Sequence, residues 1–211
     1  QNVTFTFNGI KGEGYTYNAI DLTDGTHFFA ADPAVLGTPS TITMAAWVKP
    51  TNLAGQVMSL RDLGTNPSWG STWIYLEKEK TTGQVQFCLM GRDRGSDFKD
   101  MFSGVEVKIG TWYHIAMVLD RDNREVRLYV NGKRVAEQSV SFKTSYDLYS
   151  LGTEGFQGSI DEVQFWNKAL TDEEMAVAMY GYTPDKVPAG LQGYWIFEDK
   201  CADNDKKFPN L

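Results

Sequence analysis

Short runs in which hydrophobic and polar residues alternate recur along the whole chain, separated by turn residues. Alternation with a period of two is typical of a β-strand with one buried face. Inside one such run, Asn131 and Gly132 form the dipeptide that most strongly indicates a two-residue β-hairpin. About a dozen strands in a chain of this length predict two packed antiparallel sheets. The clearest runs cover residues 3–9, 41–50, 71–77, 84–90, 111–120, 124–135, 159–166 and 191–198.

One short helix interrupts the strand pattern near the C-terminus. Thr171 and Glu174 have the spacing of a capping box, which predicts that the helix begins at Asp172. Gly181 is a typical residue for the end of a helix. The helix should therefore be about nine residues long and lie across one end or edge of the sheets.

The composition fits a single folded domain. The 211 residues are 42% hydrophobic and 22% charged, as in an ordinary globular protein. No linker divides the chain, so residues 1–211 are predicted to form one domain. The net charge of -7 and the lack of a basic run argue against a nucleic-acid partner. No apolar stretch approaches the roughly 20 residues of a transmembrane helix, and Gln1 in place of Met suggests a mature or trimmed product.

Four segments in this order resemble the concanavalin A-like, laminin-G-like jelly-roll family. They are "AIDLTDGTHFFA", "TITMAAWVKP", "GTWYHIAMVLDRDNREVRLYVNGKRV" and "GFQGSIDEVQFWNKALTDEEM". The trailing "GLQGYWIFED" is similar to the last strand of surface proteins from Bacteroidetes-type gut bacteria. The resemblance implies an all-β, two-sheet antiparallel jelly-roll sandwich in an extracytoplasmic protein, at the cell surface, in the periplasm or secreted.

The resemblance also implies a function, because carbohydrate binding and adhesion are the commonest roles of the family. Our leading hypothesis is a non-catalytic domain of a bacterial protein that binds a glycan or polysaccharide. The alternative is a structural or adhesion domain whose partner is another cell-surface protein. The fold alone does not decide between them.

The segment "LGTNPSWGSTWIYLE" carries the first candidate ligand contacts. Trp69 lies in a loop rich in Pro and Gly, where a core position is hard to explain. Trp73 and Tyr75 share one face of the following strand, and that face is either the binding surface or the core. Aromatic rings stack on the C–H surfaces of sugars, so Trp69 and Trp73 are predicted ligand contacts.

The charged segment "MGRDRGSDFKD" follows a strong strand and carries two further candidates. Arg92 and Arg94 can donate forked hydrogen bonds to sugar hydroxyls or acidic groups. The alternative is a solvated loop in which arginine and aspartate side chains pair with one another.

Asp161 is the candidate metal ligand. Alternation in residues 159–166 places it on the same side as Val163 and Phe165, and a buried carboxylate needs a partner. In related jelly-roll domains the aspartate of an "IDEV" strand can bind a structural calcium ion, and here Glu198 and Asp199 would be its companions. Calcium takes six to eight oxygen ligands and accepts carboxylates with carbonyls. The alternative is that backbone N–H groups at a sheet edge or turn satisfy Asp161.

Histidine and cysteine are scarce, which limits other site chemistry. His114 lies in a strand with hydrophobic residues on both faces and is predicted to be a hydrogen-bonded core residue. Cys88 and Cys201 are expected to be small buried hydrophobic residues, and a disulfide between them stays open. No catalytic or nucleotide-binding motif occurs in the chain.

A glycoside hydrolase is a third and disfavoured alternative. Some concanavalin A-like sandwiches are retaining glucanases, which place two carboxylates about 5 Å apart, usually with an E-x-D-x-x-E strand. The nearest run here is "SIDEVQ", in which Ser159 and Gln164 occupy the two glutamate positions. We therefore expect no enzymatic activity.

Overall fold

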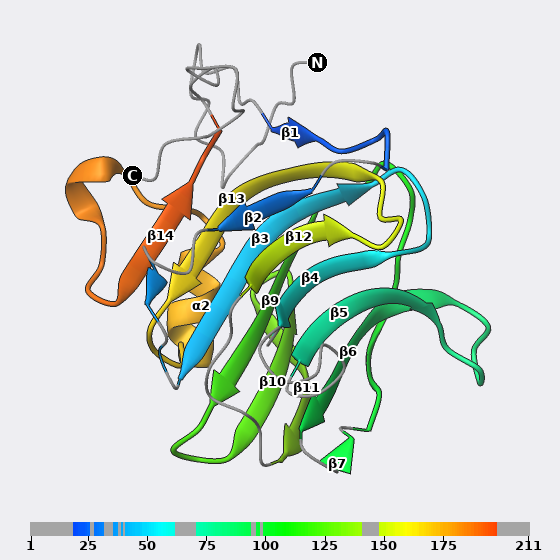
Figure 1. Cartoon of the computed structure of the whole chain (residues 1–211), viewed down its shortest axis with the longest axis horizontal. Coiled ribbons are helices and arrows are strands. Elements are labelled where there is room, and N and C mark those ends of the chain that lie inside the picture. Colours follow the sequence, from blue (N-terminus) through cyan, green and yellow to red (C-terminus); the bar gives the residue numbers. More distant parts are fainter. Residues whose placement is uncertain are drawn as a thin grey trace.

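Two antiparallel β-sheets pack face to face in the computed structural model of the protein, as the sequence predicts (Figure 1). The structure describes residues 19–25, 28–31, 36–37, 39, 41–61, 71–93, 96–97, 99–140 and 148–197. The side chains of residues 92–93, 96–97 and 184 are not among those described. The predicted strand over residues 3–9 and His27 lie outside this part of the chain.

The first sheet is called the helix-covered sheet. Its central strand is β9, which pairs with β3 on one side and β10 on the other. Its strands in spatial order are β1 (Ile20–Asp21), β13 (Gly158–Trp166), β3 (Ile42–Pro50), β9 (Tyr113–Asp120), β10 (Glu125–Val130) and β11 (Lys133–Ser139), with β14 (Leu191–Trp195) also paired to β13.

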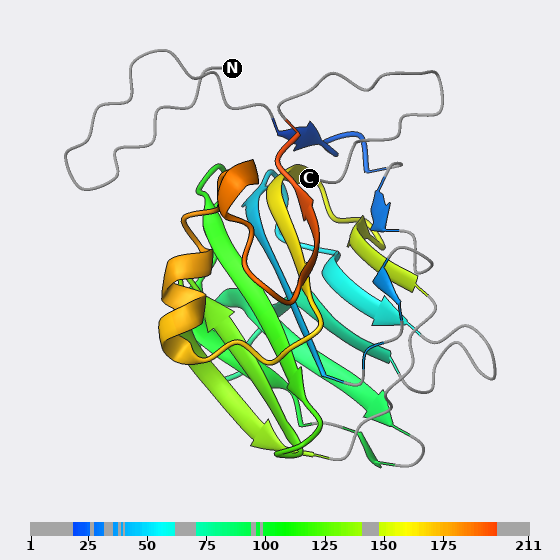
Figure 2. The same ribbon diagram turned by 90° about the vertical axis from the view of Figure 1, so that its left-hand side faces the viewer.

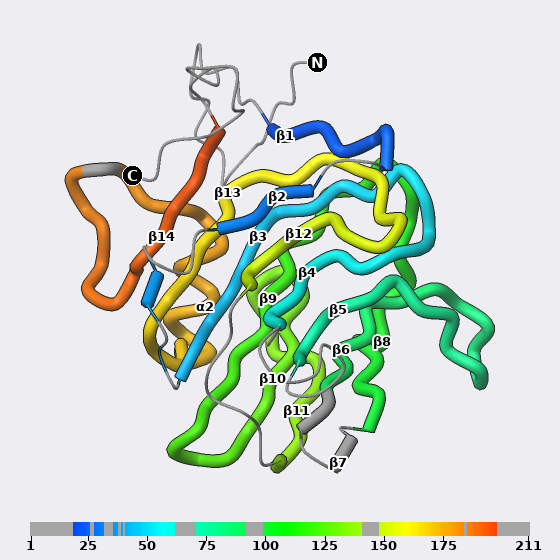
Figure 3. Tube along the Cα trace, viewed as in Figure 1, coloured from blue at the N-terminus to red at the C-terminus, as the bar shows by residue number. Residues whose placement is uncertain are grey.

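The second sheet is called the open sheet. Its strand β8 pairs with β6 beside the main path of the sheet (Figure 3). In spatial order it contains β2 (Phe29–Ala31), β12 (Leu148–Thr153), β4 (Gln56–Arg61), β5 (Ser71–Lys78), β6 (Val85–Asp93) and β7 (Ser96–Asp97), with β8 (Met101–Glu106) attached to β6.

Helix α2 (Asp172–Ala178) begins where the sequence predicts, and the short 3-10 helix η1 (Pro184–Lys186) follows it. The Thr171 side chain accepts a hydrogen bond from the backbone of Glu174, and the Glu174 side chain accepts one from the backbone of Thr171. The predicted capping box is thus confirmed, although α2 has seven residues and not nine.

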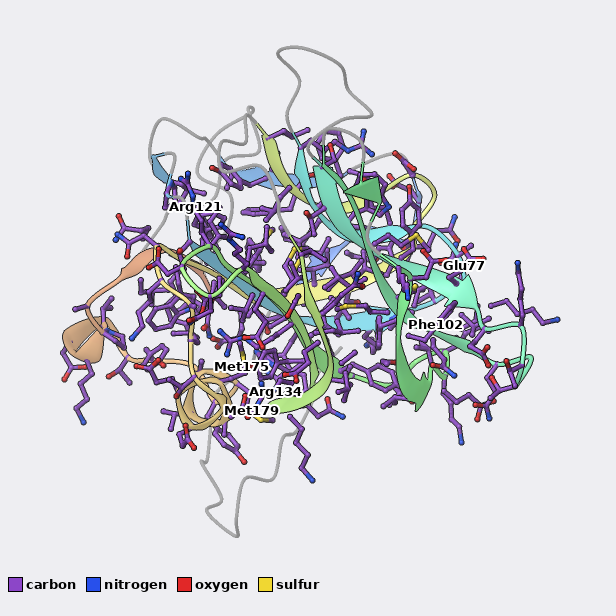
Figure 4. The ribbon with its side chains drawn as sticks, turned by 90° about the horizontal axis from the view of Figure 1, so that it is seen from below. Glu77, Phe102, Arg121, Arg134, Met175 and Met179 are labelled. Carbon is purple, nitrogen blue, oxygen red and sulfur yellow. The ribbon has the colours of Figure 1, made fainter. Side chains whose placement is uncertain are left out.

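Helix α2 lies on the outer face of the helix-covered sheet, whereas no described helix covers the outer face of the open sheet (Figure 2). Arg134 of β11 lies beside α2, with a guanidinium nitrogen 2.8 Å from Asp172 Oδ2. In Figure 4, Arg134 is seen close to Met175 and Met179, and Phe102 of the open sheet lies to their right. The two sheets therefore present different outer faces to their surroundings.

The central strands β3, β9 and β10 of the helix-covered sheet are buried on both faces, which explains their long hydrophobic runs, whereas the edge strand β11 is largely exposed. All eight residues of β9 are buried. Met117 and Leu119 belong to the core between the sheets, while Ala116 and Val118 belong to a second apolar cluster with Met175 of α2. A strand covered on both sides loses the strict alternation of a half-buried strand.

The Asn131–Gly132 turn joins β10 to β11 as predicted. Both residues have positive φ, 52° and 73°, as the type I′ hairpin turn requires. A Cβ atom added to Gly132 would lie 2.5 Å from Met179 Sδ just beyond α2, so the turn also fits closely against the helical segment.

The strand that carries Asp161 contains a β-bulge, and the predicted orientation of this residue is wrong. The pairing of β13 with β3 shifts register after Asp161, and Glu162 has a positive φ of 50°. Ile160, Val163 and Phe165 all belong to the core between the sheets. The extra residue of the bulge reverses the alternation, so Asp161 faces away from that core.

Candidate functional site

The outer face of the open sheet carries rows of aligned side chains. Strand pairing places Ser59 of β4 between Ser150 of β12 and Trp73 of β5, and Gln56 of β4 beside Tyr75 of β5. The residues that alternate with them belong to the core, among them Met58, Leu60, Ile74, Leu76 and Leu151. The rows that contain Trp73 and Tyr75 therefore face outward.

Trp73 and Tyr75 form an aromatic pair on this face. Both side chains are partly exposed, and their ring centroids are 6.3 Å apart in an edge-to-face arrangement. This geometry resolves the question left open by the sequence, because the shared strand face of the two rings is the outer one. Each ring keeps part of its surface available for a ligand.

A hydrogen-bonded polar group lies beside the aromatic pair. Glu154, just after β12, accepts hydrogen bonds from the Tyr75 hydroxyl and from Nη2 of Arg61. The same nitrogen of Arg61 also donates to Gln56 Oε1 at 3.0 Å. We call Gln56, Arg61, Trp73, Tyr75 and Glu154 the Trp73 cluster.

The protonation states within the Trp73 cluster follow from these contacts. Burial, together with the hydrogen bond to Glu154, raises the pKa of Tyr75 to about 12, so its hydroxyl stays a neutral donor. Burial alone would raise the pKa of Glu154, but the hydrogen bonds from Tyr75 and Arg61 outweigh it and lower that pKa. Glu154 is therefore an ionised carboxylate at neutral pH.

The turn that carries Glu154 is held by the surrounding structure. Glu154 has a positive φ of 49°, a conformation that a residue other than glycine seldom adopts. Asn52 donates a hydrogen bond to the carbonyl of Gly155 at 2.8 Å, and Phe156 is fully buried. A Cβ atom on Gly55 would lie 2.0 Å from the backbone nitrogen of Phe156, so the turn packs directly against the backbone just before β4. The Glu154 carboxylate is thus fixed in position before any ligand arrives.

The ligand contacts predicted from sequence fall only partly within the described residues. Trp73 lies in the Trp73 cluster. Trp69 and Arg94 lie outside the described residues. Arg92 lies in β6 opposite Ser71, at the end of the sheet where β4 ends and β5 begins, but its side chain is not described.

Sequence reasoning missed Arg61 and Glu154 as site residues. They lie 93 positions apart in the chain and meet only because β12 pairs with β4. Tyr75 was visible as the next residue on the same strand face as Trp73. For Glu154 the sequence offers one weak signal, the neighbouring Gly155, which is typical of a turn.

Asp161 has a backbone partner in the structure. Its Oδ1 accepts a hydrogen bond from the backbone N–H of Glu162 at 2.7 Å, and its strand partner is Trp47, whose indole N–H donates to the Met179 carbonyl. This arrangement corresponds to the alternative in which backbone N–H groups satisfy the carboxylate. Within the described part of the chain, no three His, Cys, Asp or Glu side chains converge as a metal site. Glu198 and Asp199, the predicted companions of Asp161, lie outside it.

His114 and Cys88 are both buried, as predicted, and both side chains stay uncharged at neutral pH. His114 is fully buried beside Trp47, but among the described residues neither of its ring nitrogens has a hydrogen-bond partner, in contrast to the predicted hydrogen-bonded histidine. Burial lowers the pKa of His114 to about 3. Cys88 is a free cysteine whose pKa burial raises to about 12, and Cys201 lies outside the described residues.

Several solved structures have a fold similar to that of this chain. A protein from Bacteroides ovatus whose name proposes carbohydrate binding is 19% identical, with a TM-score of 0.59 over 81% of this chain and 49% of that one. The chain thus spans about half the length of this relative. The CBM40 of the Ruminococcus gnavus IT-sialidase, bound to α2,3 sialyllactose, is 19% identical, with a TM-score of 0.58 over 76% of this chain and 95% of that one.

A third similar structure is domain 4 of AbnA, a GH43 extracellular arabinanase from Geobacillus stearothermophilus, in complex with arabinotriose. It is 21% identical, with a TM-score of 0.56 over 79% of this chain and 82% of that one. No curated protein matches the chain by sequence. Among the described residues, no helix combines the length and the apolar character needed to cross a bilayer.

The family is decided by a match that covers most of the chain. Residues 22–176 match the family model Laminin_G_3, described as "Concanavalin A-like lectin/glucanases superfamily". The match begins just after β1 and ends within α2, so it includes the strands of both sheets except β1 and β14, together with the Trp73 cluster. The chain therefore belongs to the concanavalin A-like lectin/glucanase superfamily.

Proposed function

We propose that the protein is a non-catalytic, glycan-binding domain of an extracytoplasmic bacterial protein, and that the Trp73 cluster is its binding site. The observation that carries this proposal is the combination of a partly exposed aromatic pair with a preorganised polar group on the outer face of the open sheet. Sugars are recognised by apolar rings that stack on C–H surfaces and by polar groups that fix the hydroxyls. The similar structures in complex with sialyllactose and arabinotriose support the proposal.

The chemistry of Glu154 supports binding in place of catalysis. A retaining glycosidase needs an acid with a raised pKa and a second carboxylate about 5 Å away. Glu154 is the only carboxylate of the Trp73 cluster, and Tyr75 and Arg61 lower its pKa. Such a group accepts hydrogen bonds well but donates a proton poorly.

The proposed location rests on two further observations. One similar structure is a domain of an extracellular arabinanase, and the chain resembles bacterial surface proteins near its C-terminus. We propose that the protein works at the cell surface, in the periplasm or after secretion, beside enzymes or transporters that process the captured sugar.

Replacement of Trp73 by alanine tests the proposed site. Loss of a stacking ring should weaken glycan binding by about tenfold or more, since each factor of ten corresponds to about 1.4 kcal/mol. The melting temperature should fall only slightly, because Trp73 is partly exposed and lies outside the core. A glycan array identifies the ligand, and calorimetric titration with that ligand measures the affinity.

The matched control is Trp112→Ala, which removes another partly exposed tryptophan. Trp112 lies just before β9 of the helix-covered sheet, where Lys49 is 5.2 Å from the centre of its ring. This variant should bind glycan as the wild type does. Equal losses of affinity in both variants, or none in Trp73→Ala, would show that the Trp73 cluster is not the binding site.

A protein partner is the second candidate function. Val177 and Tyr180, at the end of the α2 segment, are 58% and 56% exposed, which is unusual for large apolar side chains placed three positions apart. Two results together would favour adhesion over glycan binding. The protein would bind no glycan on an array, and it would bind a protein partner in a way that Val177→Asp abolishes.

A further inference from the structure

We infer that the preferred ligand is an uncharged glycan, and that Glu154 selects it by accepting hydrogen bonds from sugar hydroxyls. The inference rests on the proposed function, because it names the class of ligand at the same site. The similar structures leave this choice open, since one holds sialyllactose, which is acidic, and another holds arabinotriose, which is neutral.

The charges of the Trp73 cluster cancel. Its one cation is Arg61, and Nη2 of that guanidinium is paired with Glu154 and also bonded to Gln56. Tyr75 stays protonated and neutral at physiological pH. The described neighbours on the same face, Ser59 and Ser150, are neutral hydroxyls that bond to each other at 2.7 Å. Among the side chains that the structure describes on this face, Arg61 is therefore the one cation, and it is already paired with Glu154.

The Glu154 carboxylate has capacity left for a ligand. A carboxylate has about four lone-pair sites, and hydrogen bonds from Arg61 and Tyr75 occupy one on each oxygen. The side chain is 47% exposed, so the remaining sites face solvent. Sugar hydroxyls can donate to these sites, and hydrogen bonds to a charged group are the stronger kind.

An acidic sugar meets the opposite situation on this face. Its carboxylate would lie next to Glu154 and would be repelled, unless it displaced Glu154 from Arg61. Displacement would also break the hydrogen bond that Tyr75 donates to Glu154. The turn that holds Glu154 is fixed by Asn52 and packs against Gly55, which opposes such a movement.

Affinity electrophoresis of the intact protein against polysaccharides tests the inference. The neutral set is arabinan, galactan, xylan and mannan, and the acidic set is polygalacturonate, alginate and heparin, with lactose and sialyllactose as a matched soluble pair for titration. We expect binding to at least one neutral glycan, with an affinity about tenfold or more above that for every acidic one. Preference for an acidic glycan would overturn the inference while leaving the proposed function intact. Binding to none of them, at high protein concentration, would overturn both.

Glu154→Gln sharpens the test, because it removes the negative charge and leaves Arg61 unpaired. Affinity for the neutral ligand should fall about tenfold. Affinity for acidic glycans should increase, and about 1 M salt should abolish this increase because it screens the charge of Arg61. The control is Glu173→Gln, which changes the total charge equally at an exposed site on α2. Unchanged neutral binding in Glu154→Gln would overturn the inference. The wild-type comparison keeps the inference falsifiable even if the variant does not fold.

Discussion

At the scale of single residues, His114 is the clearest case of a side chain held in one protonation state by its surroundings. It lies fully buried on β9 with its ring 5.6 Å from that of Trp47, and neither ring nitrogen has a hydrogen-bond partner in the part of the chain that the structure describes. Burial disfavours the charged form and lowers its pKa from 6.5 to about 3.

This burial predicts a pH dependence of stability. Below pH 6.5 the unfolded chain protonates the histidine while the folded chain does not, so stability is lost as the pH falls from about 6.5 to about 3. The limiting slope is about 1.4 kcal/mol per pH unit for this one group. Urea denaturation of the wild type and of His114→Phe across this range measures the effect. The variant should show the shallower acid slope, whatever its stability at neutral pH, and parallel slopes would contradict the prediction.

At the scale of elements, the Glu154 turn depends on a close approach between β4 and the segment after β12. Gly55 has a φ of 96°, and a Cβ atom there would lie 2.0 Å from the backbone nitrogen of Phe156. Backbone atoms cannot move aside as the end of a flexible side chain can. The position of the proposed recognition residue is therefore tied to Gly55, which lies directly before β4.

Gly55→Ala should lower both stability and glycan affinity. The control is Gly110→Ala, which has a similar positive φ of 76° but no atom within 4 Å of the added Cβ. Both variants should lose about 1 to 2 kcal/mol from backbone strain, and Gly55→Ala about 2 kcal/mol more from overpacking. Chemical denaturation measures the difference, and titration with glycan should show a loss only for Gly55→Ala. Equal losses of stability in the two variants would show that the close approach at Gly55 does not contribute to the free energy of unfolding.

Local sequence signals predicted the elements well, and they failed where an element depends on a distant one. The capping box of Thr171 and the Asn131–Gly132 turn act within a few residues, so their structures could be read directly. The bulge at Glu162 could not be read in this way. A bulge turns every later side chain of the strand to the opposite face, but the hydrophobic and polar residues of the strand look the same with or without it. Arg61 and Glu154 meet only through strand pairing, which no local pattern reveals.

At the scale of the whole molecule, the structural role proposed for calcium can be tested directly. The reason to expect a metal was a carboxylate in the core, but Asp161 faces away from that core and accepts a backbone N–H bond. We therefore expect that chelation with EDTA leaves the melting temperature unchanged. A metal bound only to the folded state would add about 2.7 kcal/mol to the free energy of unfolding at a hundredfold excess over its Kd. A fall of the melting temperature on chelation, reversed by added calcium, would therefore contradict this expectation and support a calcium site.

The two sheets contribute unequally to holding the molecule together. Strand β9 lies between two apolar clusters, one shared with the open sheet and one shared with α2. The side chains of the Trp73 cluster belong to neither of these clusters. The side chains of the proposed binding site are thus largely separate from the side chains that form the apolar clusters.

This separation has a consequence for how new specificities can arise on the same framework. Substitutions at the outward positions of β4 and β5 alter a recognition surface without opening a cavity in either apolar cluster. A combinatorial library at the partly exposed positions Arg61, Trp73 and Tyr75 should therefore retain a high fraction of folded members, and selection on different glycans could draw divergent binders from one parent. The same freedom would let related chains drift apart in sequence while the sandwich beneath them persists.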